Sequence, residues 1–214
     1  MADNRQRQGN YSCQVLEESQ ESSSAKKRIG LLGGTFNPIH QGHLMVAEQV
    51  YEKLCLDRVD FMPSNLPPHV EHKETIAADK RLAMLDLAIQ ANDHFAIEKI
   101  ELDRPGKSYT YDTMDILTTL HPDNEYYFII GGDMVENLPK WYRVEELMQL
   151  CHFVGVQRPG YDMPSDYNII YVDSPQIDIS SSYIRQSVNK GSSIRYLLPE
   201  TVRDYIDKEG LYRD

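Results

Sequence analysis

Two histidines three residues apart, His40 and His43, are the side chains of this chain best placed to do chemistry. They end the stretch 33–43, GGTFNPIHQGH, which follows a short apolar run and precedes an amphipathic one. At a helix start, residues spaced by three share one face. The backbone N–H groups of such a start can bind an anion, and glycines let a ligand approach the backbone. The stretch therefore predicts a phosphate site where two imidazoles face charge that changes during a reaction.

The same residues have plainer interpretations. A glycine turn before a helix is common, and two histidines at this spacing could be half of a zinc site, which needs three or four ligands. No cysteine is near them in sequence, and Glu48 lies on the wrong side of the turn to be an obvious third ligand. A Walker A loop does not fit, because the sequence lacks the lysine of G-x-x-x-x-G-K-[ST]. We therefore assign no metal ligand to the protein itself.

The elements that must position these residues alternate between strand and helix patterns. Strands are expected at residues 29–32, 59–62, 95–97, 126–130, 152–156 and 169–172. Helices are expected at residues 44–56, 78–91, 109–120, 144–150, 180–189 and between Pro199 and Gly210. The alternation predicts an α/β fold with a Rossmann-like, doubly wound parallel sheet in a single domain. Ligands bind such sheets beyond the carboxyl ends of the strands, where the turns after residues 29–32 and 126–130 should both lie.

A second candidate phosphate site is the stretch 179–185, ISSSYIR. Serines at a helix start cap some free N–H groups and leave others for an anion. Arg185, one turn further on, can reach back with a two-pronged guanidinium. An ordinary serine cap beside a surface arginine would give the same sequence.

Aromatic and hydroxyl residues form a third candidate site. Residues 108–113, SYTYDT, open a helix, and the single tryptophan, Trp141, stands beside Tyr142. A flat ring binds well against aromatic faces, and a carboxylate on that ring needs N–H donors or a cation. Core packing is the plainer interpretation of Trp141. Asp133 lies in the turn after residues 126–130, and its plainer interpretation is that it caps a helix.

Together these stretches resemble the signature of bacterial nicotinate-nucleotide adenylyltransferases, which carry an H-x-G-H motif. Residues 33–43 are similar to the family's G-G-T-F-D-P-[IV]-H-x-G-H, with Asn37 in place of the usual Asp, and residues 179–185 are similar to its I-S-S-T-x-I-R. Both motifs occur in the family's order. The resemblance covers residues 29–185 and implies transfer of AMP from ATP to nicotinate mononucleotide, giving nicotinate adenine dinucleotide and pyrophosphate.

The resemblance also implies roles for individual residues. The catalytic residues would be His40, His43, Thr35 and Arg185, with Mg²⁺ carried by the ATP phosphates. The implied ATP-binding residues are Gly33, Gly34, Thr35, Phe36, His40, His43, Gly131, Asp133, Ile179, Ser181, Ser182 and Arg185. The implied mononucleotide-binding residues are Ser108, Tyr109, Thr110, Trp141, Tyr142 and Lys73. The family has a lysine at the position that Val70 occupies here, and Lys73 would take over its role. The plainer interpretation of Lys73 is a solvated surface lysine. Arg81 is interpreted as a surface or inter-element contact.

Composition limits the partners. A net charge of −11 argues against nucleic acid, and no apolar run reaches the ~20 residues of a membrane span. Residues 1–26 are polar and predict a mobile tail, which leaves one domain at 27–214. Three cysteines without a C-x-x-C pair, and no secretory signal, predict free thiols and a cytoplasmic location. The sequence leaves open whether the chain forms a homo-oligomer.

Several other functions share the H-x-G-H start. They are adenylyl transfer to nicotinamide mononucleotide or phosphopantetheine, cytidylyl transfer to alcohol phosphates, and nucleotide sensing without catalysis. Residues 108–113 with Trp141 and Tyr142 favour a pyridine substrate, and the intact histidines and Arg185 favour catalysis. The choice of nicotinate over nicotinamide rests on the resemblance, because no dedicated cation for the carboxylate is evident. An aminoacyl-tRNA synthetase fragment fits neither the length nor the acidic charge.

Overall fold

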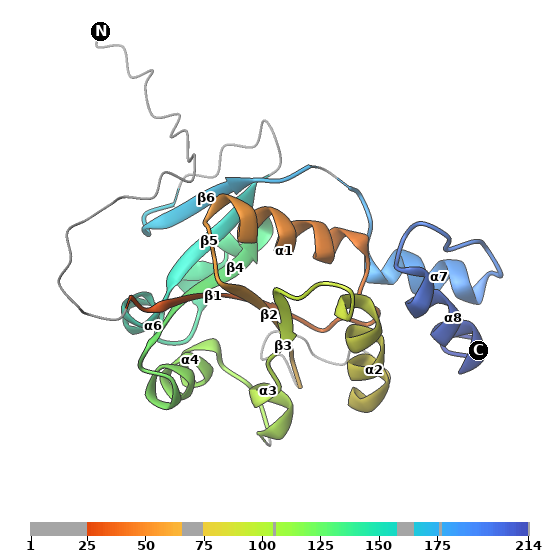
Figure 1. Ribbon diagram of the computed structural model, residues 1–214, viewed down its shortest axis with the longest axis horizontal. Helices are drawn as coiled ribbons and strands as arrows, with labels where there is room; N and C mark the ends of the chain where they lie inside the picture. The colour runs from red at the N-terminus through yellow and green to blue at the C-terminus, as the bar shows by residue number, and fades with distance from the viewer. Residues whose placement is uncertain (1–24, 66–74, 105, 158–164, 176, 214) are drawn as a thin grey trace, which may run out of the picture.

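The computed structural model describes residues 25–65, 75–104, 106–157, 165–175 and 177–213 (Figure 1). Nearly all of the predicted tail, and the predicted ligand Lys73, lie outside these ranges. Within the ranges, no helix combines the length and the apolar character that crossing a membrane requires.

One parallel sheet forms the centre of the molecule, and its strand order in the described residues is β3-β2-β1-β4-β5-β6. The strands are β1 (Lys27–Gly34), β2 (Arg58–Pro63), β3 (Phe95–Ile97), β4 (Asn124–Gly131), β5 (His152–Gln157) and β6 (Ile169–Asp173). β1 pairs with both β2 and β4, so the chain changes its direction of travel across the sheet between these neighbours. Doubly wound sheets bind ligands at this switch point. The predicted fold class is confirmed.

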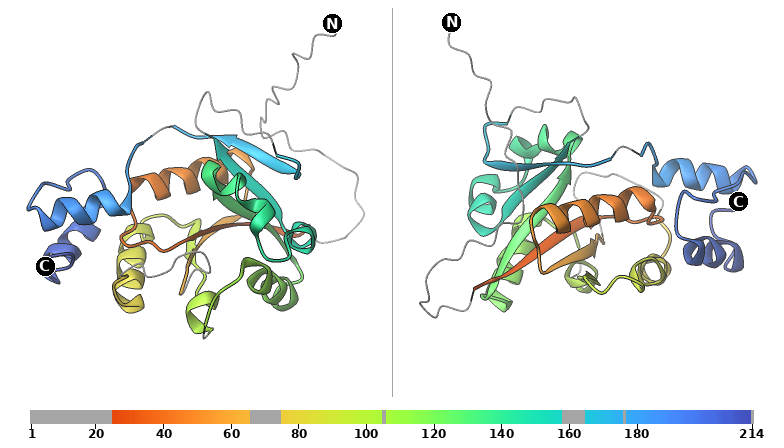
Figure 2. Two further views of the ribbon diagram at one scale, coloured as in Figure 1. Left: turned by 180° about the vertical axis from the view of Figure 1, so that it is seen from behind. Right: turned by 45° about the horizontal axis from the view of Figure 1, so that its top comes forward.

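Helices cover both faces of the sheet (Figures 1 and 2). They are α1 (Gln41–Lys53), α2 (Ala78–Ile89), α3 (Ile100–Asp103), α4 (Thr110–Leu120), α5 (Gly132–Val135), the 3₁₀ turn η1 (Leu138–Lys140), α6 (Val144–Leu150), α7 (Ser181–Asn189) and α8 (Glu200–Lys208). α1 packs on one face against β1, β2 and β6, while α4 and α6 contact each other on the opposite face. α7 and α8 stand beyond the sheet, where α8 contacts α2.

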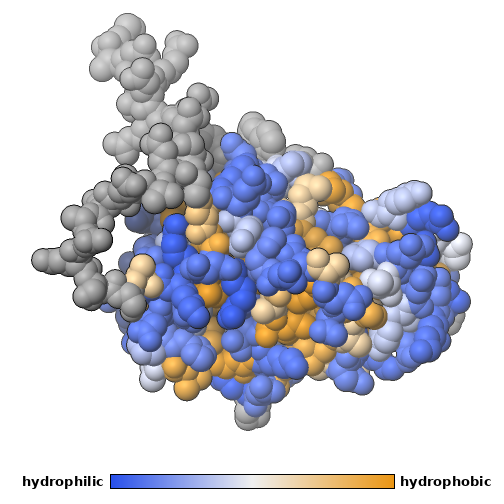
Figure 3. All heavy atoms as spheres, viewed as in Figure 1, coloured by the Kyte–Doolittle hydropathy of each residue, from blue (hydrophilic) through white to orange (hydrophobic). Residues whose placement is uncertain are grey.

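The core explains why the strand segments of the sequence are apolar. Residues 126–130 of β4 are all buried because the strand is covered on both faces. Their side chains alternate between the two core clusters, with Tyr127 and Ile129 under α1 and Phe128 and Ile130 under α4 and α6. The viewed surface is mostly hydrophilic, with apolar residues exposed near its middle (Figure 3).

Two expectations need correction. The four-residue helix α3 was not predicted, because so short a segment carries no helical periodicity. Cys151 is buried and free, as expected, but Cys55 is disulfide-bonded. The sequence gives no sign of this bond; Cys55 is partly exposed in a left-handed turn (φ 47°) just after α1.

Candidate active site

The loop between β1 and α1 holds the two histidines against each other. His40 is the residue that caps α1, His43 lies in its first turn, and their rings stack with centroids 3.7 Å apart. The backbone N–H of His40 donates to Nδ1 of His43 at 3.2 Å. Because Nδ1 accepts this bond, the neutral ring of His43 carries its proton on Nε2. His43 therefore offers one N–H donor to a ligand.

Both imidazoles are neutral in the ligand-free protein. Burial lowers the pKa of His40 to about 4, and burial together with the neighbouring His40 lowers the pKa of His43. Nδ1 of His40 is buried, and among the described residues no side chain donates to it. An unpaired buried nitrogen costs free energy that a bound ligand can recover. With lowered pKa values, the two imidazoles can hydrogen-bond a ligand as neutral rings rather than present two positive charges to it.

The glycine turn is shaped by Phe36. This residue adopts a left-handed conformation (φ 48°), and its ring is buried edge-to-face against His43 at 5.1 Å and Phe61 at 5.8 Å. A Cβ at Gly34 would lie only 3.0 Å from the Phe36 ring, so a larger residue here would have to displace that buried ring slightly. Phe36 was predicted to bind ATP. Its side chain belongs to the core, which leaves only its backbone for that role.

The second predicted phosphate stretch lies directly against this loop. The Ser181 hydroxyl donates to the Pro38 carbonyl at 2.8 Å across 143 residues, and Arg185 Nη1 donates to the Asn37 carbonyl at 2.8 Å. Ser180 supplies the helix cap, because its hydroxyl accepts from the Tyr183 N–H at 3.2 Å. The two stretches that the sequence placed far apart thus form one site.

The turn after β4 reaches the same edge of the sheet. Gly131 ends β4 and caps α5, which contains Asp133. β4 is the direct neighbour of β1, so this turn and the histidine loop leave the sheet side by side. That Gly131 and Asp133 contact ATP stays a prediction.

The aromatic candidate site is assembled in part. Tyr109 caps α4, Thr110 is its first residue, and Tyr142 lies half-exposed with its ring 5.0 Å from that of Tyr109. The Ser108 hydroxyl is buried and finds no hydrogen-bond partner in the part of the chain that the structure describes. Trp141 instead packs edge-to-face on Phe128 and Phe153, at 6.1 and 5.9 Å. The Trp141 ring therefore packs in the core, which fits its interpretation as a core residue.

Comparison with known proteins agrees with this geometry. Residues 31–187 match the cytidylyltransferase-like family model. The chain is 56% identical over 200 residues to a probable nicotinate-nucleotide adenylyltransferase of Enterococcus faecalis, covering 94% of this chain and 91% of the relative. It is 57% identical over 198 residues to a Streptococcus pyogenes protein of the same name, covering 92% and 94%.

The chain belongs to the cytidylyltransferase-like family, and within it to the nicotinate-nucleotide adenylyltransferases. Its fold is also that of the Plasmodium falciparum nicotinic acid mononucleotide adenylyltransferase, solved in complexes with NaAD and with APC. The TM-scores are 0.73 and 0.71 at 21% and 20% identity, and each match covers 87% of this chain and 97% of the solved one.

Sequence reasoning missed the burial of Arg81 in this adenylyltransferase. Arg81 is only 3% exposed, and its Nη1 donates to the carbonyls of Thr35 and Ser64 at 2.9 Å each. Burial lowers the pKa of its guanidinium. Of the two interpretations of Arg81, a contact between elements is therefore correct and a surface contact is wrong. Arg81 shares a helical face with Met84 and Leu85, and that spacing was the available signal.

Glu101 is a second buried charged residue that the sequence did not reveal. It lies in α3, 6% exposed, with Oε1 3.1 Å from the Thr113 hydroxyl of α4. Burial raises the pKa of Glu101 to about 7, opposed by the contacts with Thr113 and Arg104. This carboxyl contacts the first turn of α4, the helix whose start was predicted to bind the mononucleotide.

The described residues contain no group of three or more His, Cys, Asp or Glu side chains that could hold a metal ion. The histidine pair therefore has no third ligand within that part of the chain. A magnesium ion at this site would fit as a companion of substrate phosphates, with water completing its shell.

Proposed function

We propose that this enzyme transfers AMP from ATP to nicotinate mononucleotide, releasing pyrophosphate and forming nicotinate adenine dinucleotide. The observation that carries the proposal is the contact of the two phosphate stretches, through Ser181 to Pro38 and Arg185 to Asn37. It brings two helix starts, each able to bind an anion, against each other. The names of the closely similar relatives support the same reaction.

The mononucleotide phosphate oxygen attacks the α-phosphorus, and the bond from that phosphorus to the β-phosphate oxygen breaks. The attacking phosphate is already anionic at neutral pH, so no general base is required. We assign His40 and His43, with Thr35, to the α-phosphate, where His43 donates from Nε2. Ser181, Ser182 and Arg185 bind the departing pyrophosphate. Catalysis is then positioning and charge stabilisation.

Residues of this chain would not need to hold a magnesium ion directly, because such an ion would accompany the ATP phosphates and would supply charge neutralisation at the leaving group. The positive potential that an anionic substrate needs is local, because the whole chain carries a net charge of −11. It comes from backbone N–H groups, Arg185 and this ion. The same net negative charge argues against nucleic acid as a partner.

The mononucleotide is proposed to bind at the start of α4, with its pyridine ring near Tyr109 and Tyr142. The backbone N–H groups of residues 108–110 would meet the nicotinate carboxylate, which needs donors rather than a dedicated cation. Nicotinamide mononucleotide is the nearest competitor because a carboxamide differs from the carboxylate by one charge.

The test is a pyrophosphate-release assay with ATP, Mg²⁺ and three acceptors: nicotinate mononucleotide, nicotinamide mononucleotide and phosphopantetheine. We expect the highest kcat/KM with nicotinate mononucleotide. Higher kcat/KM with either other acceptor would reassign the substrate, and ATP binding without pyrophosphate release would indicate a nucleotide sensor. A cytoplasmic location belongs to the same proposal and is checked by fractionating cells; association of copies is checked by light scattering.

A further inference from the structure

The last residues of the described chain reach back to the catalytic loop. The Tyr212 hydroxyl donates to Asn37 Oδ1 at 2.8 Å, across 175 residues. Asn37 is the position where the family pattern usually has Asp, and it is 4% exposed. Burial raises the pKa of the Tyr212 hydroxyl, so this group remains a donor throughout the working pH range. An amide oxygen at position 37 is the acceptor that it meets.

The contact belongs to a set that joins the C-terminal region to the loop on several sides. Arg185 binds the main-chain carbonyl of Asn37, whereas Tyr212 binds its side chain. On the far side of the loop, the Gln41 N–H donates to the Leu197 carbonyl at 3.0 Å. The loop that carries the histidines is thus bounded by α7, by the connection to α8 and by the segment after α8.

The backbone after α8 is bent to bring Tyr212 into place. Gly210 and Tyr212 both adopt left-handed conformations, with φ of 61° and 62°. Glycine takes this conformation freely, but a tyrosine in it is uncommon and costs energy. The ring of Tyr212 packs on the core that α1, α7 and α8 share. Packing and the bond to Asn37 together hold a conformation that tyrosine alone would avoid.

We propose that Tyr212 is a positioning residue for adenylyl transfer, acting on the histidine loop through Asn37. Asn37 lies between Phe36, which packs on His43, and Pro38, which binds Ser181. Loss of the Tyr212 hydroxyl removes one hydrogen bond that holds the Asn37 side chain, and the loop can shift relative to the start of α7. A small misplacement of groups that must meet a transition state lowers kcat by about 10- to 100-fold. This inference rests on the proposed reaction.

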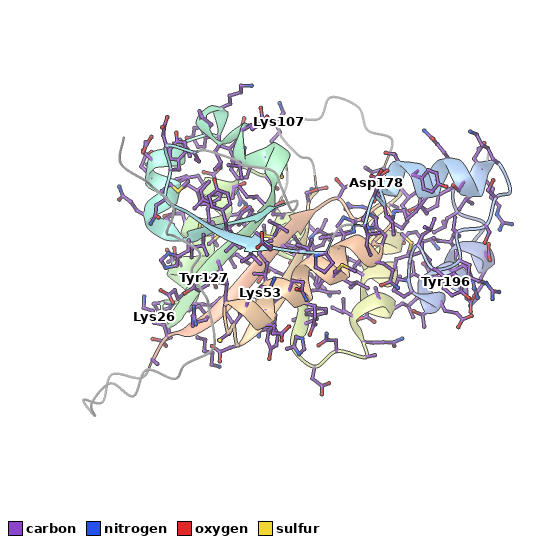
Figure 4. The ribbon with its side chains drawn as sticks, turned by 90° about the horizontal axis from the view of Figure 1, so that it is seen from above. Lys26, Lys53, Lys107, Tyr127, Asp178 and Tyr196 are labelled. Carbon is purple, nitrogen blue, oxygen red and sulfur yellow. The ribbon has the colours of Figure 1, made fainter. Side chains whose placement is uncertain are left out.

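The first test compares Tyr212→Phe with a matched control, Tyr196→Phe. Tyr196 lies in the same C-terminal region, 83% exposed, at the outer end of the molecule (Figure 4). Tyr212→Phe should lower kcat at least 10-fold while the KM for the mononucleotide changes less than 3-fold. The control should match the wild type. Circular dichroism and thermal unfolding establish that both variants are folded at the assay temperature. A Tyr212→Phe kcat within 2-fold of the wild type overturns the proposal.

A double-mutant cycle with Asn37→Ala separates positioning from general stability. Asn37→Ala removes the Oδ1 acceptor but keeps the main-chain carbonyl that binds Arg185. If Tyr212 acts through Asn37, the double variant should have a kcat within 2-fold of the poorer single variant. Effects that multiply would show that the two side chains act independently, which contradicts the proposed route.

A readout that needs no turnover distinguishes this inference from the proposed reaction. Side-chain NMR of the ligand-free protein reports the ring resonances of His40 and His43. Tyr212→Phe should shift or broaden both, and Tyr196→Phe should leave them unchanged. If the wild type fails to release pyrophosphate but the rings respond, the reaction is wrong and the positioning contact stands. Unchanged ring resonances in Tyr212→Phe refute the contact whatever the activity.

Discussion

Neutral, buried histidines make the stability of this enzyme depend on pH, and His40 allows the size of that dependence to be worked out. Its pKa is about 4 in the folded protein and about 6.5 in an unfolded chain. Between these values the unfolded chain binds more protons, so the free energy of unfolding falls as pH falls. From pH 7.5 to pH 5.0, His40 alone should remove about 2 kcal/mol.

The perturbation is His40→Asn, which removes the titrating ring and leaves a residue that is favoured at a helix cap. Its free energy of unfolding should drop about 2 kcal/mol less between pH 7.5 and 5.0 than that of the wild type. Removing His40 also removes one cause of the lowered pKa of His43, which changes the pH dependence in the same direction. Glu101, whose raised pKa gives a dependence of opposite sign, is present in both proteins and cancels in the difference.

Urea unfolding followed by circular dichroism at both pH values gives the comparison. The exposed His121, at the end of α4, provides the control His121→Asn, which makes the same substitution away from the site. Equal pH dependence in His40→Asn and the wild type would refute the reasoning, since it would mean that His40 folds without losing its affinity for a proton.

Three further predictions follow from the same contacts. His43→Ala should lower kcat about 10²- to 10³-fold with a modest change in KM, as for loss of a transition-state donor. Steady-state pyrophosphate release measures both constants, and a near-normal kcat would exclude the ring from the mechanism. Arg81→Met should lower the free energy of unfolding by about 2–4 kcal/mol, because the Thr35 and Ser64 carbonyls lose their donor; urea unfolding at pH 7.5 tests this, and an unchanged midpoint would contradict it. The buried Glu101 carboxyl lowers the free energy of unfolding as pH rises from 4.5 through 7, because burial opposes its ionisation. The change that Glu101→Gln makes in the free energy of unfolding should therefore be about 2–3 kcal/mol more stabilising at pH 8 than at pH 5. Equal effects at the two pH values would show that the carboxyl is not held protonated.

The elements of the fold could be predicted because their signals are local. β1, the glycine turn and α1 are contiguous, and the buried run of β4 can be read directly from residues 126–130. Alternation then fixes the fold class, since parallel strands need crossover helices. The meeting of residues 33–43 with residues 179–185 was expected from their shared resemblance, and the contacts of Ser181 and Arg185 confirm that they are adjacent.

The residues that support the site from behind could not be predicted, because their partners are set by packing between distant segments. Arg81 reads as one cation in an amphipathic helix, and only the folded chain brings it under Thr35. Glu101 lies in a helix too short to have a period. Tyr212 follows the last helix and looks like part of a terminus, yet it meets Asn37. Each of these contacts depends on side-chain reach across elements; helical spacing signals that Arg81 is buried, but it does not identify the partners.

The state of Arg185 in the ligand-free enzyme links substrate binding to the loop. Its two terminal nitrogens donate to the Asn37 carbonyl at 2.8 Å and to the Ser182 hydroxyl at 3.2 Å. A guanidinium has five N–H donors, so it can bind an anion while keeping the loop contact, and the retained bond to Asn37 then fixes where that anion sits. In the proposed reaction, Arg185 at the leaving group and the alignment of the histidines would therefore be linked through one residue of the loop, Asn37. That is the physical reason to expect substitutions at this position, or at Tyr212 behind it, to lower kcat without abolishing nucleotide binding.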